Sequence, residues 1–223
     1  MESKNEDNKL EKKIRNFLDK SEIPKNFSIK KENWHQTQNS FLVSGSYDKS
    51  IKILNLCSGN VQEALDNNNE EVLCLLKISN SEFASSSDKN IKIWSLNSMK
   101  IWDPKILLGH SDRVFCLSVL DRDKKNFIII SGSFDSTIKL WNINDSSCIR
   151  TLMGHTDVIW HVVSQKTSQI ISASGDLDRS IRIWYINSRY ESVKNQVLVQ
   201  HRRSILCLVL LLNGFLGLLI IFL

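Results

Sequence analysis

The feature that most constrains this chain is a motif that occurs four times. Each copy has a short polar turn with an aspartate, then a run of alternating apolar and basic residues that ends in Trp or Leu six residues after the aspartate. Aligned without gaps, the copies are SGSYDKSIKIL at 44–54, ASSSDKNIKIW at 84–94, SGSFDSTIKLW at 131–141 and SGDLDRSIRIW at 174–184. The aspartates are 40, 47 and 43 residues apart. A repeat of this period predicts a chain built from one supersecondary unit used several times.

Each copy has the pattern of β structure. Period-two alternation of β-branched and aromatic residues is typical of a half-buried antiparallel strand. The turn aspartate has a physical role, because its carboxylate accepts hydrogen bonds from turn amides that have no strand partner. Further strands are expected upstream of the turns at 72–78, 114–120 and 159–163, and Gly-His precedes two of them, at 109–110 and 154–155.

The order of Gly-His, about two dozen residues, a turn Asp and a strand ending in Trp resembles the WD-repeat family. The resemblance covers residues 34–217 and implies an all-β fold, a WD-repeat β-propeller in which each repeat supplies one four-stranded blade. We expect four recognisable blades plus the start of a fifth, a partial or truncated propeller. The expected segments are 34–65, 66–108, 109–152, 153–200 and, for the partial fifth blade, 201–217.

Four and a half blades leave open sheet edges, which proteins usually avoid. Three alternatives would resolve this: self-association of copies completes the propeller, a partner completes it, or the chain is a fragment of a longer product. We favour the fragment.

In the family, a His, a Ser or Thr, the turn Asp and the strand Trp form a hydrogen-bonded tetrad within a blade. Carried over by position, the resemblance implies one tetrad in the third copy and one in the fourth: His110, Ser131, Asp135 and Trp141, then His155, Ser174, Asp178 and Trp184. The first copy keeps Ser44 and Asp48 but has Leu54 in place of Trp.

The second copy keeps only Asp88 and Trp94 of the tetrad. Ala84 occupies its serine position and Asn68 its histidine position. The first two blades are therefore expected to be less tightly braced than the later ones.

The recurring His, Ser and Asp also resemble the triad of a hydrolase. They recur in successive copies, however, and one active site per blade has no chemical purpose. The nucleophile motif Gly-x-Ser-x-Gly does not occur in the sequence. We therefore predict a structural role for these residues, no catalytic residue and no enzymatic activity.

No metal or cofactor is predicted. The five histidines lack metal-ligand spacing, and the sequence contains no Cys-x-x-Cys and no Gly-rich phosphate loop. Three cysteines recur at one position of the inner strands, which indicates a small packing slot: Cys74, Cys116 and Cys207. The net charge of +5 is spread along the chain, so no nucleic-acid partner is predicted.

The two ends of the sequence differ from the repeats. Residues 1–33 carry nine basic and seven acidic side chains and predict a charged arm with a short helix, which packs on the first blade or docks a partner. Residues 205–223 carry no charge. One interpretation continues the repeat through 217 with a hairpin turn at 213–214. The alternative is a transmembrane helix that anchors the protein by its tail.

The leading hypothesis for function is a non-enzymatic, adaptor-like scaffold that binds proteins or peptides. A membrane-tethered WD-repeat protein is the alternative. The candidate partner-binding residues precede the turn aspartates or begin inner strands: Tyr47, Phe134, Leu177, Arg113, Phe115 and Trp160. For Phe115, Trp160 and Leu177, packing between blades is an equal alternative.

The expected location is the cytoplasm, with a membrane as the alternative. Five cysteines are an odd number and no apolar run follows Met1, so reduced thiols and synthesis in the cytosol are expected.

Overall fold

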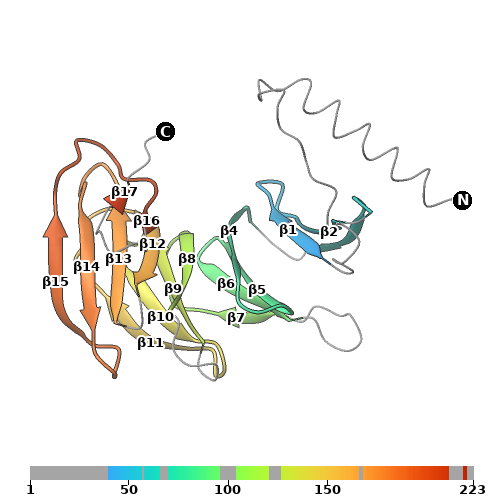
Figure 1. Cartoon of the computed structure of the whole chain (residues 1–223), viewed down its shortest axis with the longest axis horizontal. Coiled ribbons are helices and arrows are strands. Elements are labelled where there is room, and N and C mark those ends of the chain that lie inside the picture. Colours follow the sequence, from blue (N-terminus) through green and yellow to red (C-terminus); the bar gives the residue numbers. More distant parts are fainter. Residues whose placement is uncertain are drawn as a thin grey trace, which may run out of the picture. The chain divides into compact units, whose positions relative to one another are not determined.

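The structure is a computed structural model, which describes residues 40–56, 58–65, 70–95, 104–120, 127–165, 168–210 and 218–219. Every element in this described part is a strand, a turn or a loop (Figure 1). The predicted arm at 1–33 and its helix lie outside the described residues.

The strands form sheets in the order in which they occur along the chain (Figure 1). Blade 1 contains β1 (Phe41–Gly45), β2 (Ile51–Asn55) and β3 (Val61–Leu65). Blade 2 contains β4 (Val72–Lys77), β5 (Glu82–Ser87), β6 (Asn90–Ser95) and β7 (Lys105–Leu107). Blade 3 contains β8 (Val114–Leu120), β9 (Ile128–Ser133), β10 (Ile138–Asn142) and β11 (Ser147–Leu152). Blade 4 contains β12 (Ile159–Gln165), β13 (Gln169–Ser174), β14 (Ile181–Ile186) and β15 (Ser192–Leu198).

Each blade is an antiparallel meander, because every strand pairs with the one before it and the one after it. The first strand of blades 2 to 4, here called the inner strand, is an edge of its sheet (β4, β8 and β12). Each inner strand has a bulge near its start, where the pairing skips one residue: Leu73, Phe115 and Trp160. A bulge redirects the side chain at which it occurs.

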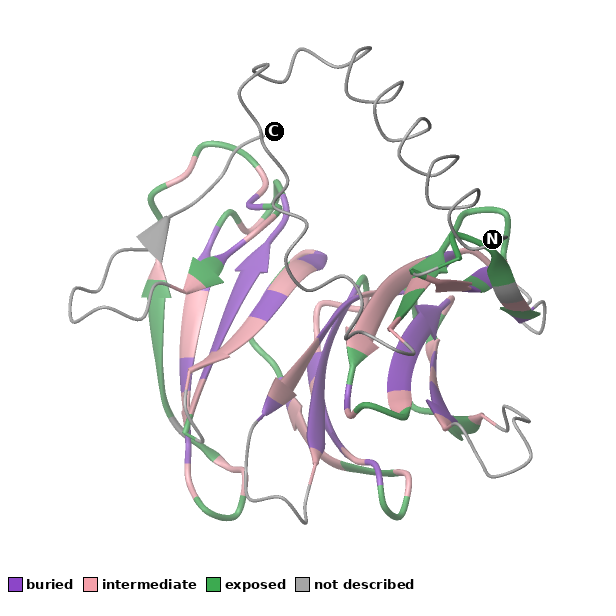
Figure 2. Ribbon diagram, turned by 45° about the vertical axis from the view of Figure 1, so that its right-hand side comes forward, coloured by how far each residue is buried: buried purple, intermediate pink, exposed green. Residues whose placement is uncertain are grey.

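The core lies between neighbouring blades. Isoleucine-rich strands present apolar faces, and neighbouring blades bury these faces against each other (Figure 2). One such layer joins Cys116, Ile130 and Leu140 of blade 3 to Ile159 and Trp184 of blade 4. The large buried residues therefore stabilise the contact between blades as well as the blades themselves.

The chain after blade 4 continues in the same way. Ile205 and Leu208 are buried against blade 4, together with Ile171, Ala173 and Ile181. The amide of Ile205 donates to the carbonyl of Ser174 at 3.0 Å, just as the amide of Val72 donates to the carbonyl of Ser46 at 3.0 Å.

Beyond this contact, β16 (Val209–Leu210) pairs antiparallel with β17 (Leu218–Leu219). Ile205 thus takes the place of the first residue of an inner strand. The described part of 205–223 favours the interpretation in which the repeat continues. Within the described residues, no helix has the length and apolar character needed to span a membrane.

Two equivalent positions test how much the contact between blades contributes to stability. Ile129 and Leu42 each lie two residues before the serine of their strand, but Ile129 is fully buried and Leu42 is 50% exposed. We expect Ile129→Ala to lower the free energy of unfolding by about 2–5 kcal/mol. Leu42→Ala should lower it by less than about 1 kcal/mol. Urea denaturation followed by tryptophan fluorescence measures both, and equal losses would contradict the packing described above.

Candidate functional site

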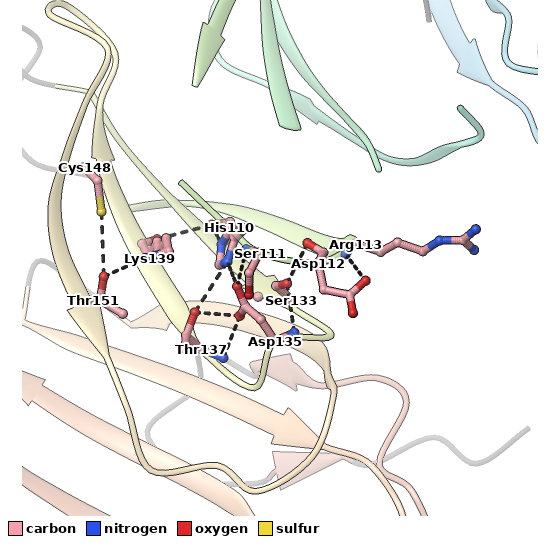
Figure 3. Close-up of polar contacts among 12 residues, drawn as sticks. His110, Ser111, Asp112, Arg113, Ser133, Asp135, Thr137, Lys139, Cys148 and Thr151 are labelled. Atoms are coloured by element: carbon pink, nitrogen blue, oxygen red, sulfur yellow. Dashed lines mark hydrogen bonds and ion pairs between the residues drawn. The ribbon is translucent and has the colours of Figure 1, made fainter. Parts of the chain in front are cut away.

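The most connected polar cluster of the described residues lies in blade 3 (Figure 3). His110 comes from the loop before β8, Ser131 from β9, Asp135 from the β9–β10 turn and Trp141 from β10. The Nδ1 atom of His110 lies 2.7 Å from Asp135 Oδ2, and its Nε2 atom lies 2.7 Å from Ser131 Oγ. The Trp141 indole donates to the same Ser131 hydroxyl at 2.8 Å. The four residues predicted from the third repeat are therefore joined by hydrogen bonds.

Local sequence places each of these groups. Gly109 has a φ of 154°, and a Cβ there would lie 3.1 Å from the Trp141 ring. A glycine therefore lets the loop pass close enough to bring His110 over the sheet. In the turn, Thr137 donates to Asp135 Oδ1 from its hydroxyl at 2.6 Å and its amide at 3.0 Å. The amide of Ser111 donates to Asp135 Oδ2 at 3.0 Å.

These hydrogen bonds set the charge of the cluster. Burial alone would raise the pKa of Asp135, but hydrogen bonds from His110, Thr137 and Ser111 outweigh it and hold the pKa well below its usual range. Since the Asp135 carboxylate can only accept, His110 Nδ1 carries a proton.

The connectivity resembles an Asp–His–Ser triad, but Ser131 is not placed to attack a substrate. Ser131 and the His110 side chain are fully buried. The serine oxygen already accepts from Trp141, and its single proton is shared between His110 Nε2 and the carbonyl of Lys139. A nucleophile needs an open approach to its oxygen, and here the tryptophan ring occupies that approach. The geometry is that of a structural brace.

Blade 4 contains the same cluster, but its serine is not the predicted one. His155 Nδ1 lies 2.7 Å from Asp178 Oδ2, but its Nε2 lies 2.7 Å from the hydroxyl of Ser172, to which Trp184 also donates at 2.9 Å. The prediction of Ser174 as the tetrad serine is therefore wrong. Ser174 instead donates to the carbonyls of Asp157 and Val158 at 3.1 and 2.9 Å.

The reason for this error is that the turns differ in length. Five residues separate the paired Gly132 and Ile138 in blade 3, whereas seven separate the paired Ala173 and Ile181 in blade 4. The gap-free alignment on the aspartates therefore shifted the strand before the turn by two residues.

Blade 2 needs the same correction. Trp94 donates to Ser85 at 2.8 Å, so Ser85 supplies the serine and Ala84 does not replace it. Asp88 lies in a two-residue turn with a φ of 52°, and its carbonyl accepts the amide of Val114 at 2.8 Å. Asn68, in the expected histidine position, lies outside the described residues.

Blade 1 has the turn of the motif without the tryptophan. Asp48 accepts from the hydroxyl of Ser50 at 2.6 Å and from its amide at 2.9 Å, and these bonds lower its pKa. Ser44 donates to the carbonyl of Lys52 at 3.4 Å, as Ser131 does to Lys139 in blade 3. Leu54 is half-buried in the place of the tryptophan.

The recurring cysteines lie where the packing interpretation put them. Cys116 is buried, Cys74 and Cys207 are half-buried, and burial raises the pKa of Cys116 and of Cys74. In the part of the chain that the structure describes, no group of three or more His, Cys, Asp or Glu side chains is arranged to hold a metal ion.

The candidate partner-binding residues divide by exposure. Tyr47, Phe134 and Leu177, each directly before a turn aspartate, are 72%, 51% and 81% exposed. Phe115 and Trp160 are half-buried at the bulges, with ring centroids 4.7 Å apart, and Phe134 lies 6.3 Å from Phe115.

Two further contacts complete this region. The carbonyl of Arg113 accepts the amide of Phe134 at 2.9 Å, and the Arg113 guanidinium lies 3.7 Å from Glu71. The structure therefore brings Arg113, Phe115, Phe134 and Trp160 together across blades 3 and 4. We call these four residues the aromatic patch.

The corrected serine register has a spectroscopic test. Ser172→Ala should shift the indole ¹H–¹⁵N resonance of Trp184, because the indole loses its acceptor, and should lower the free energy of unfolding by about 1–3 kcal/mol. Ser174→Ala removes an equally buried hydroxyl but should leave the Trp184 indole resonance in place. The opposite pattern would restore Ser174 to the tetrad.

The depressed pKa of Asp135 predicts the direction of acid sensitivity. Because the folded-state pKa lies below the unfolded value of about 3.8, the ionised carboxylate stabilises the fold above that pH, and this stabilisation is lost as the pH falls further. Asp135→Asn should be less stable than the wild type at pH 7 and lose less stability between pH 5 and 3. Urea denaturation across this range measures the slopes, and equal slopes would contradict the assignment.

Comparison with known proteins gives one family. The profile of the family described as WD domain, G-beta repeat matches residues 29–55, 59–95, 104–142 and 146–185, more than half of the chain. Among curated proteins, the chain is 31% identical over 163 residues to WD repeat-containing protein pop2 of Schizosaccharomyces pombe, covering 58% of this chain and 22% of that protein. It is 42% identical over 76 residues to coatomer subunit beta'-2 of Arabidopsis thaliana, covering 33% and 8%.

The solved structures show the same fold. The protein in "Structure of U3-55K" matches with a TM-score of 0.64 at 26% identity, over 77% of this chain and 52% of that one. The protein in "Crystal structure of RRP9 WD40 repeats" matches with a TM-score of 0.65 at 26% identity, over 77% and 51%. The chain thus spans about half the length of these structures and under a quarter of the curated relatives named above, and its four blades form a propeller fragment that is not closed. This chain belongs to the WD40 repeat family.

Proposed function

We propose that this protein is a non-enzymatic, adaptor-like scaffold that binds other proteins or peptides at the loop end of its blades. The observation that carries the proposal is the exposure of three apolar side chains at one position of the repeat: Tyr47, Phe134 and Leu177. Apolar side chains exposed singly are ordinary, but exposed apolar side chains that gather in one region mark interaction sites. WD40 domains are typically protein-interaction modules, which supports this choice of function.

The aromatic patch is the best candidate for the centre of such a surface. Its aromatic rings already pack against one another in the absence of a partner. Binding a partner there therefore orders few further side chains and costs little conformational entropy. Arg113, also a member of the patch, adds a cation, and its side chain is 47% exposed. Aromatic residues and arginine are the usual energetic anchors of interfaces. The earlier alternative, in which Phe115 and Trp160 pack between blades, is compatible with this role because both remain half-buried.

Catalysis is not part of this proposal. The Ser131 and Ser172 hydroxyls are buried, and each is hydrogen-bonded to a tryptophan and a histidine, so neither is open to a substrate. The tethering alternative receives no support from the described part of 205–223, which packs against blade 4. The cytoplasmic location and the self-association of copies stay predictions.

The proposal is tested by crosslinking the full chain to its partners in cells and measuring the affinity of each purified partner. Phe134→Asp and Leu177→Asp should each weaken binding about tenfold or more, since each places a charge on a contact surface. Val199→Asp is the matched control, because Val199 is 64% exposed and follows β15. Unchanged affinity in both Phe134→Asp and Leu177→Asp, or a loss only in the control, would overturn the proposal.

A further inference from the structure

The inner strands of neighbouring blades are linked by a repeated contact. The thiol of Cys74 in β4 hydrogen-bonds the backbone of Leu117 in β8, and the thiol of Cys116 in β8 hydrogen-bonds the backbone of Val162 in β12. In each case the side chain is two residues after the start of one inner strand, and the backbone group is three residues after the start of the next. An inner strand is a sheet edge, so some of its amides have no partner in the ladder, and this contact gives them one.

At the next link, a histidine replaces the cysteine. His161 lies two residues after the start of β12, and the amide of Leu208, three residues after Ile205, donates to its Nδ1 at 3.4 Å. Because a backbone amide can only donate, Nδ1 must be unprotonated, and the ring is neutral with its proton on Nε2. A protonated ring has no acceptor and loses this contact.

His161 is one of several contacts that hold residues 203–210, here called the docked segment. The amide of Ser204 donates to the Asp176 carboxylate, and Arg203 forms an ion pair with it at 3.7 Å. Ile205 and Leu208 are 1% and 2% exposed. The pKa of Asp176 is lowered by the bonds from Ser204, so this carboxylate stays ionised at pH 5 and above.

Among the residues that the structure describes, the strands around His161 supply no charge to stabilise an imidazolium. The strands packed against β12 are β8, β9, β13 and β16, and none of them contains Asp, Glu, Lys or Arg. Their titratable groups, with those of the docked segment up to β16, are the thiols of Cys116 and Cys207 and the Arg203 guanidinium at its start. Burial lowers the pKa of His161, in agreement with these surroundings.

We propose that His161 is a pH-sensitive latch that holds the docked segment against blade 4 when neutral and releases it when protonated. This goes beyond the proposed function. The pKa of His161 is lower in the docked state than in the released state. Docking is therefore fully favoured above the free histidine value of about 6.5, and it weakens as the pH falls through the docked-state pKa of His161. The docking equilibrium should fall about tenfold for each pH unit by which docking lowers that pKa.

Hydrogen exchange of the full chain, corrected for intrinsic rates, tests the latch between pH 7.5 and 5. Protection of peptides from 203–210 should fall with pH, while protection of peptides from 114–120, whose contact is made by Cys74, should stay constant. His161→Cys is the matched control, because it installs the residue of the other inner strands and keeps every other histidine. Protection of 203–210 in this variant should not depend on pH. Equal pH dependence in wild type and variant would overturn the proposal.

A second measurement keeps the test independent of the stability of that variant. Leu208→Pro removes the amide that donates to His161 without changing the histidine. Because coupling between protonation and docking is reciprocal, the NMR-measured pKa of His161 should rise toward 6.5 in Leu208→Pro. An unchanged pKa would mean that the docked segment does not act on His161.

Discussion

The structure depends on a hydrogen bond between a tryptophan and a serine at the centre of each complete blade. Trp94, Trp141 and Trp184 each donate to a fully buried serine hydroxyl on the neighbouring strand. Burying an indole is costly unless its N–H is satisfied, and each of these three rings packs between two blades. In blades 3 and 4 the histidine and the turn aspartate extend this bond to the surface, so the packing of the core and the shape of the loops are set together.

That coupling explains why the loop end suits binding. Asp135 holds the turn before β10 in place, because its carboxylate accepts hydrogen bonds from the histidine and from two backbone amides. A side chain next to such a turn, such as Phe134, is displayed on a rigid support. Recognition residues can then vary while the residues that hold the turn remain the same.

The all-β fold and its four blades were predictable from the sequence, because the repeat, the strand alternation and the Gly-His pairs all indicated one unit. The tetrad of blade 3 was also predictable, since its turn has the same length as the turn of blade 1. The serine of blade 4 was missed because the alignment assumed one turn length. A signal was present: Ser131 and Ser172 each directly follow a run of isoleucines, and Ser85 follows Phe-Ala. The contact of His161 with the following segment depends on the spatial register of two sheets. Its only sequence signal is that His161 occupies the position at which the other inner strands have a cysteine.

The turn between the two central strands has two residues between its paired ends in blade 2, five in blade 3 and seven in blade 4. With all three turn lengths, the tryptophan indole still donates to the serine hydroxyl of its blade. The two extra residues of blade 4 bring in Asp176, which reaches across to the following segment. This position therefore tolerates insertion, and it is a natural place for the chain to acquire new specificity or for an engineer to graft a peptide without disturbing the sheet beneath.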